Sequence, residues 1–165
     1  MIIFKITVLS HSNLAHSPYI TGMTERPFAR VISLLQRAGL RPTRQRMALA
    51  KLLFEQGHRH LTAEELHEEA KSADIRVSLA TVYNTLHQFT DVGLLREVMV
   101  GPGRAYFDTN NSAHHHFFYE DTGDIQDIPE NDVTIAQLPA LPAGTQLNRV
   151  DVVVRVSNID PESRN

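Results

Sequence analysis

The 165-residue sequence contains no cysteine and no tryptophan, and it has no long apolar run. Without cysteine there can be no disulfide bond, no thiolate zinc site and no cysteine nucleophile. Any metal ion would therefore have to be held by nitrogen and oxygen ligands. Because no stretch is long and apolar enough to cross a bilayer, we expect a cytoplasmic protein without a membrane partner.

Acidic residues outnumber basic ones, and the net charge is −3, but the two signs are unevenly distributed. Residues 23–107 carry 12 Lys and Arg against 9 Asp and Glu, whereas residues 108–165 carry 3 against 10. One basic run contains no intervening acid: Arg26, Arg30, Arg37, Arg41, Arg44, Arg46 and Lys51. Such a run suits phosphate groups, although an ordinary solvated surface is the alternative.

The stretch from Ser78 to Thr90 has the pattern of an amphipathic helix with Ser78 as its N-cap. Its apolar positions recur at helical spacing: Leu79, Val82, Leu86 and Phe89. Its other faces carry short uncharged polar groups: Thr81, Tyr83, Asn84, Thr85, His87 and Gln88. Hydroxyls and amides of this kind suit a helix in a DNA major groove, where Tyr83 could pack on a thymine methyl. An ordinary solvated helix would show the same pattern.

A hairpin is predicted directly after this helix. Residues 94–100 and 104–109 have strand character and flank Gly101-Pro102-Gly103, which places Arg104 at the tip. Upstream, residues 28–39 predict a first helix that ends at Gly39. Pro42 is expected to open a second helix, and a capping box at Thr62–Glu65 predicts a third over 62–73. This order is typical of a winged helix-turn-helix domain, which we place at 23–109.

The remainder of the chain predicts a small sheet. Two strands are expected around the turn at 121–124, and a third at 150–156, with at most one short helix between them. Three strands are too few to be stable alone, so we expect 110–157 to be a small α/β dimerisation domain. The predicted fold class is α+β, and residues 1–22 and 158–165 are expected to be a disordered extension and tail.

Histidines are concentrated in two places. On a strand, His114 and His116 point to one face and His115 to the other, and His58 and His60 have the same spacing. Imidazoles so arranged can bind a metal ion or the iron of haem. The alternative is a solvated run or neutral core histidines.

Several segments together resemble the ferric uptake regulators, the metal-responsive winged-helix repressors of bacteria. The resemblance covers about 23–157 and is carried, in order, by GLRPTRQRMALAKLL, HRHLTAEELH, SLATVYNTLHQFTDVGLL and the histidine cluster. The combination of SLATVYNTLHQF, three consecutive histidines and no cysteine is similar to the iron response regulators of alphaproteobacteria, which act in iron and haem homeostasis.

The resemblance implies a hinge site in which His60, Asp108, His114 and His116 hold Fe²⁺, Mn²⁺ or Zn²⁺. The chain departs from many family members because it has no CxxC motif for a structural zinc, and Arg149 stands near an expected histidine of a second sensory site. The Cys-Pro haem motif is also missing, so any haem would need histidine. The haem candidates are His58, His60, His114, His115 and His116.

We therefore predict a homodimeric transcription regulator that binds AT-rich, imperfectly palindromic operator DNA. Two sets of residues are expected at the DNA: Ser78, Thr81, Tyr83 and Asn84 on the reading helix, and Arg44, Arg46 and Arg104 at phosphates. Haem, supplied free or by a haem-delivering protein, is the predicted signal; a divalent-metal or peroxide sensor without haem is the alternative. A small metalloenzyme with an open coordination position is a second alternative, weakened because no motif places a second carboxylate near the triplet.

Overall fold

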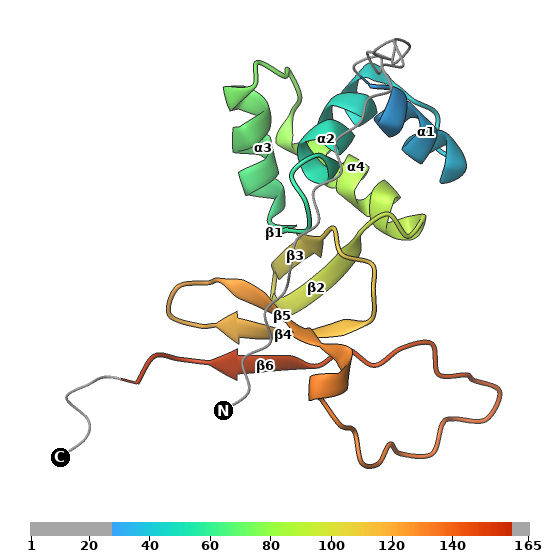
Figure 1. Cartoon of the computed structure of the whole chain (residues 1–165), viewed down its shortest axis with the longest axis vertical. Coiled ribbons are helices and arrows are strands. Elements are labelled where there is room, and N and C mark those ends of the chain that lie inside the picture. Colours follow the sequence, from blue (N-terminus) through green and yellow to red (C-terminus); the bar gives the residue numbers. More distant parts are fainter. Residues whose placement is uncertain (1–27, 160–165) are drawn as a thin grey trace, which may run out of the picture.

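Four helices lie above two small sheets in the computed structural model, which describes residues 28–159 (Figure 1). The fold is α+β, as predicted. The expected extension at 1–22 and most of the expected tail at 158–165 lie outside the described residues. Among residues 28–159, no helix is both long and apolar enough to cross a membrane.

The helices are α1 (Ala29–Arg37), α2 (Arg44–Phe54), α3 (Ala63–Ser72) and α4 (Leu79–Asp91). Side-chain caps define three of their starts. Thr43 accepts a hydrogen bond from the backbone of Arg46, so α2 begins after Pro42 rather than at it. Thr62 and Glu65 form the predicted capping box of α3, and Ser78 caps α4 as predicted.

Apolar residues of all four helices form one core with the first sheet. Its fully buried side chains include Leu35, Leu49, Leu66, Leu86 and Phe89. Burying side chains of this size contributes roughly 1.5–3 kcal/mol each relative to exposure. Packing in this core fixes the position of α4 against α1, α2 and α3.

The first sheet has the order β1-β3-β2 and consists of β1 (His60–Leu61), β2 (Arg96–Gly101) and β3 (Arg104–Asp108). β2 and β3 are the predicted hairpin, whereas β1 is too short to be recognised from sequence. Phe107 packs into the helical core. Because side chains alternate along a strand, Tyr106 and Asp108 point the other way.

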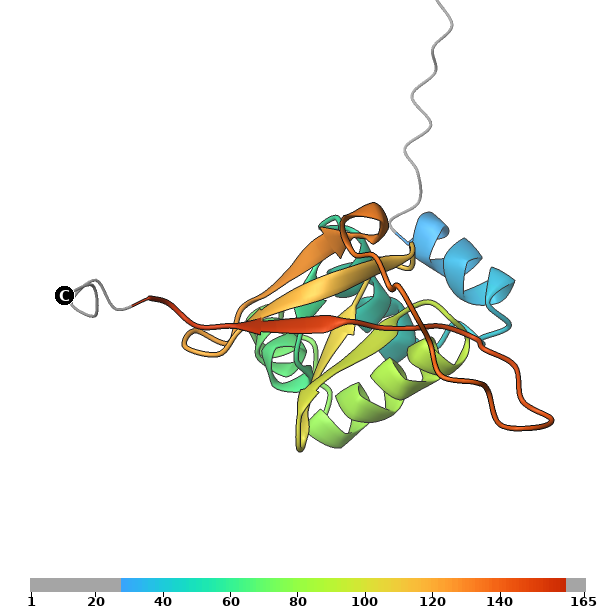
Figure 2. The ribbon, with the colours of Figure 1, turned by 90° about the horizontal axis from the view of Figure 1, so that it is seen from below.

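The second sheet has the order β5-β4-β6 and consists of β4 (His114–Tyr119), β5 (Ile125–Pro129) and β6 (Val153–Val156). β5 is antiparallel and β6 parallel to β4. The one short helix is the 3-10 turn η1 (Glu130–Asp132). The segment from Val133 to β6 has no regular element and forms the wide loop in Figures 1 and 2.

The two sheets meet through a second apolar cluster of Val98, Val100, Tyr106 and Phe118. Polar contacts reinforce it: the Tyr106 hydroxyl donates to the carbonyl of Gly123, and Arg155 donates to the carbonyl of Val100. Because Phe118 faces the first sheet, His114 and His116 on the same face of β4 also point toward it. This packing creates the candidate site.

Candidate metal centre and nucleic-acid interface

Five side chains converge where the two sheets meet. His60, Asp108, His114, His116 and Asp127 each offer one ligand atom, and these atoms lie within 4.8 Å of one another. Strand pairing brings them together: His60 is opposite Asp108 on β1 and β3, and His116 is opposite Asp127 on β4 and β5. Opposed residues of antiparallel strands share one face, so each pair points into the cluster.

The ligand atoms of the cluster face one another at short range. His60 Nε2 lies 2.9 Å from Asp127 Oδ1, and His114 Nε2 lies 2.9 Å from Asp108 Oδ2 and 3.0 Å from His116 Nε2. Three of these buried atoms lack a hydrogen-bond partner within residues 28–159: His60 Nε2, Asp108 Oδ2 and Asp127 Oδ1. Buried polar atoms without partners are costly, and a shared cation would satisfy all of them.

The environment keeps His60 and Asp108 in the protonation states that bind metal. Burial lowers the pKa of His60, despite the opposite influence of Asp108 and Asp127, and so favours the neutral imidazole. Burial alone would raise the pKa of Asp108, but the His116 imidazole and the backbone N–H of Asn110 lower it, and Asp108 stays ionised. Three imidazoles and two carboxylates form a mixed donor set that suits Fe²⁺, Mn²⁺ or Zn²⁺.

Arg96 lies beside the cluster without joining it. Its guanidinium group is buried, donates to the carbonyl of Ser112 and to Asp151 Oδ1, and lies 2.9 Å from His114 Nδ1. These contacts fix the ring of His114 with Nε2 toward the other ligands. Partners of this kind orient metal-binding histidines.

The α4 surface presents part of the predicted DNA-reading set. Asn84 is exposed, and Tyr83 is 37% exposed with its hydroxyl donating to Glu64 on α3. The hydroxyls of Ser78 and Thr81 lie 2.9 Å apart at the helix start. Thr85 does not belong to the polar surface: it is buried, and its hydroxyl donates to the carbonyl of Thr81.

The three predicted phosphate-binding arginines have different surroundings. Arg44 is exposed and lines a groove of about 770 Å³ together with Arg76, which the sequence analysis did not single out. Arg46 donates through Nε and Nη2 to Gln88 Oε1 and through Nη1 to the carbonyl of Arg41. Arg104 turns back from the hairpin tip, donates to the Tyr106 hydroxyl and stacks on Phe118.

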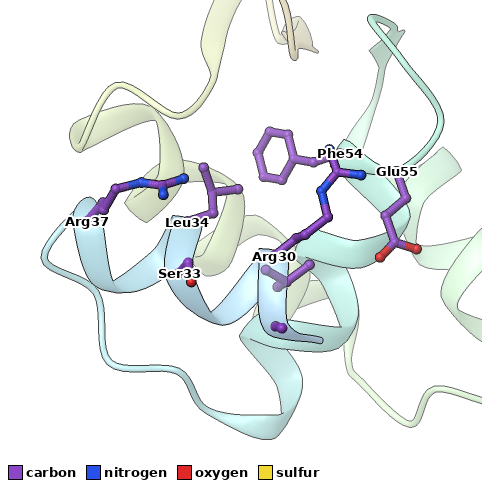
Figure 3. Close-up of a pocket in the computed structure, with 8 residues that line it drawn as sticks. Arg30, Ser33, Leu34, Arg37, Phe54 and Glu55 are labelled. Carbon is purple, nitrogen blue, oxygen red and sulfur yellow. The ribbon is translucent and has the colours of Figure 1, made fainter. Parts of the chain in front are cut away.

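A separate pocket of about 520 Å³ lies between α1 and the end of α2 (Figure 3). Arg30 and Arg37 reach its two sides, with Leu34 and Phe54 between them. None of the five clustered side chains lines this pocket. Its charged lining consists of these two guanidinium groups and the carboxylate of Glu55.

Residues 37–155 match the profile of the ferric uptake regulator family. The chain belongs to the ferric uptake regulator family. The peroxide-responsive repressor PerR of Staphylococcus aureus is 36% identical over 97 residues, which are 59% of this chain and 65% of that protein. PerR of Staphylococcus epidermidis is equally similar, over 64% of its length. The match therefore spans slightly less than two thirds of these relatives.

Solved structures of the ferric uptake regulator family have the same fold. The Pseudomonas aeruginosa regulator with manganese is 27% identical and has a TM-score of 0.59, with 78% of this chain and 97% of that chain covered. The Vibrio cholerae regulator has a TM-score of 0.61 at 22% identity, with coverage of 78% and 99%. The relatives named here are regulators rather than enzymes.

In this member of the ferric uptake regulator family, all four residues predicted as metal ligands belong to the cluster, and Asp127 is a fifth member that was not predicted from sequence. Counting strand pairs outward from the predicted turn at 121–124 would have placed Asp127 opposite Phe118, on the same face as His116 but two positions away from the observed pairing with His116. No motif placed a second carboxylate near the histidine triplet, and the pairing of β4 with β5 brings Asp127 there.

The five predicted haem candidates are not brought to one place. His58 is exposed and outside the cluster. His115 is buried on the other face of β4, where its Nδ1 accepts a 3.4 Å hydrogen bond from the backbone of Val152. His60, His114 and His116 belong to the metal cluster.

Proposed function

We propose that this protein is a DNA-binding transcription regulator whose DNA affinity is controlled by a divalent metal ion. The observation that carries the proposal is the five-residue cluster between the two sheets. Family membership and the helix α4 beside a β2–β3 wing support the DNA-binding role. The manganese in the Pseudomonas aeruginosa structure supports the proposal that this protein also binds a divalent metal ion.

The cluster contains residues of both structural parts. His60 and Asp108 belong to the first sheet, which carries the wing, and His114, His116 and Asp127 belong to the second. An ion bound by all five would hold the winged helix at one angle to the second sheet. In a homodimer joined through the second sheet, this angle would set the separation of the two α4 helices and hence the fit to a palindromic operator.

Metal-dependent binding to DNA tests this proposal directly. Fluorescence anisotropy would measure the affinity of the metal-free protein for operator DNA, before and after addition of Fe²⁺ under anaerobic conditions, Mn²⁺ or Zn²⁺. We expect tighter binding with metal, and Asp127→Asn and His116→Ala should remove the metal effect. His58→Ala is the matched control, because His58 is exposed and outside the cluster. Equal DNA affinity with and without metal in the unmodified protein would overturn the proposal.

We further propose that Tyr83 and Asn84 read bases in an AT-rich operator, with Ser78 and Thr81 at the start of α4 beside the backbone. Tyr83→Ala should cost about 1–3 kcal/mol at the correct operator and reduce discrimination against random DNA. A selection of bound sequences from a random pool would identify the operator. A Tyr83→Ala variant with unchanged base preference would contradict this assignment.

The signal itself has two candidates. Peroxide is supported by the similarity to peroxide-responsive repressors, since Fe²⁺ in the cluster would be open to oxidation. Haem was predicted from sequence. It is supported by the position of His115, which lines a cavity of about 470 Å³ together with Ile135 and Arg149. Peroxide is expected to release DNA from the Fe²⁺-loaded but not the Mn²⁺-loaded protein. Haem is expected to release DNA from the unmodified protein but not from His115→Ala.

A further inference from the structure

Asn110 lies in the segment between β3 and β4, which joins the winged helix to the second sheet. It is half-buried beside the metal cluster but offers no ligand atom to it. Its backbone N–H donates a 2.6 Å hydrogen bond to Asp108 Oδ1, and its side-chain Nδ2 donates a 2.8 Å hydrogen bond to Asp127 Oδ2. One residue therefore holds both carboxylates of the cluster.

The orientation of the Asn110 amide is itself determined. Its Oδ1 accepts hydrogen bonds from the backbone N–H of Ser112 at 3.1 Å and from the Ser112 hydroxyl at 2.7 Å. Because a backbone N–H can only donate, the atom that faces Ser112 must be the amide oxygen. The NH₂ group is therefore directed to Asp127.

These hydrogen bonds divide the four carboxylate oxygens into two kinds. Asp108 Oδ1 and Asp127 Oδ2 accept hydrogen bonds from Asn110, whereas Asp108 Oδ2 and Asp127 Oδ1 each lie 2.9 Å from a histidine Nε2. Asp108 Oδ1 is farther from the histidines, at 3.6 Å from His60 Nε2. The second pair are the carboxylate atoms that lack a hydrogen-bond partner among the described residues. A donor on one oxygen occupies one of its lone pairs and fixes the orientation of the carboxylate, so the other oxygen is the better placed one to bind an ion.

We propose that Asn110 is a positioning residue that makes Asp108 and Asp127 single-oxygen ligands and thereby sets the coordination number and metal preference of the site. This inference rests on the proposed metal function. With Asn110 in place, the chain supplies five donors, three nitrogens and two oxygens. Without its NH₂ group, Asp127 can turn and bind through both oxygens, which raises the number of oxygen donors. Such a change favours Mn²⁺, which accepts oxygen ligands in octahedral geometry, over Zn²⁺.

Cobalt(II) provides the test, because its visible absorption weakens as coordination rises to six. The variants are Asn110→Ala and Ser112→Ala, the second of which removes only the hydroxyl contact to Asn110 Oδ1. Asn111→Ala is the matched control: its amide donates to the carbonyls of Gly93 and Leu94, away from the cluster. Competition titrations with Mn²⁺ and Zn²⁺ would measure the metal preference of each protein.

We expect Asn110→Ala to weaken the Co²⁺ absorption and to lower the affinity for Zn²⁺ relative to Mn²⁺ by about tenfold, a usual effect of a lost hydrogen bond to a metal ligand. Ser112→Ala should change the Co²⁺ absorption and the metal preference in the same direction but by less. If Asn110→Ala does not fold, the result for Ser112→Ala tests the inference instead. Wild-type spectra and metal preference in the folded Asn110 and Ser112 variants would overturn the inference while leaving the metal site intact. An unmodified protein that binds no Co²⁺ would overturn the metal site and this inference together.

Discussion

The Tyr83 hydroxyl donates a 2.7 Å hydrogen bond to Glu64 Oε1 and so connects α4 to α3. This bond raises the pKa of Tyr83, and the phenol stays neutral at ordinary pH. The ring also stacks on His87, with 6.2 Å between the ring centroids. A residue proposed to read bases is therefore held by a carboxylate on the same surface, and DNA must compete with Glu64 for its hydroxyl.

Replacement of Glu64 should strengthen DNA binding. Glu64→Gln removes a negative charge next to α4 and weakens the bond to Tyr83, so we expect the dissociation constant for DNA to fall about fivefold, or on the order of 1 kcal/mol. The matched control is Glu68→Gln on the same helix, because Glu68 pairs with Lys71 rather than with Tyr83. Equal gains in the two variants would mean that charge alone, and not the contact with Tyr83, determines the effect.

The arginines at the start of α2 should differ in the kind of binding that they support. Arg44→Ala should weaken binding to all DNA sequences. It should also reduce the slope of log K against log [salt] by the amount expected for about one lost phosphate contact. Arg46→Ala should in addition reduce discrimination between operator and random DNA, because it frees Gln88 on α4. Anisotropy titrations of both DNAs at several salt concentrations would measure this, and indistinguishable variants would contradict it.

The contact between the β2–β3 hairpin and the β4–β5 turn can be tested with two glycines. Gly123 has φ of +79°, and a Cβ there would collide with the guanidinium group of Arg104. Gly103 has φ of +69° with open space around it, so Gly103→Ala reports the backbone cost alone, about 1–2 kcal/mol. Gly123→Ala should cost more in urea unfolding because it also displaces Arg104. If the two variants lose the same free energy of unfolding, the Arg104 side chain moves aside without cost.

The metal-free protein should lose stability as pH falls from about 7 to about 5.5. The unfolded chain protonates His60 near its usual pKa of about 6.5, whereas burial keeps the folded His60 neutral to lower pH. The unfolded state then binds more protons, so the free energy of unfolding decreases through this window. Asp108 adds a further decrease in the free energy of unfolding at pH values below this window. Its pKa is lowered in the folded state, so its contribution to stability is lost only when the carboxylate protonates.

Urea unfolding at constant ionic strength would measure this decrease, and His60→Gln should make it shallower. Added Mn²⁺ or Zn²⁺ should stabilise the protein most at neutral pH, because protons compete with metal for the imidazoles. A His60→Gln variant with an unchanged pH profile would assign the decrease to other groups.

Sequence alone predicted the features that depend on neighbours within a few positions. The N-cap at Ser78, the capping box of Thr62 and Glu65, and the β2–β3 hairpin each require only local spacing. Alternation along β4 also separated His115 from His114 and His116, because side chains of a strand alternate between faces. The resemblance supplied His60 and Asp108, which spacing could not have connected.

Tertiary structure decided which distant groups meet. β1 exists only because β3 offers it a partner, and this pairing brings His60 to Asp108. Asp127 joins the cluster through the register of β4 and β5, and Asn110 reaches both carboxylates because the chain turns between the two sheets. Arg104 was predicted at the hairpin tip and is exposed there, but its guanidinium group turns back to Tyr106 on its own strand and to Phe118 of the second sheet. The direction of a long side chain depends on the nearest partner in space, and residues far apart in the chain provide that partner.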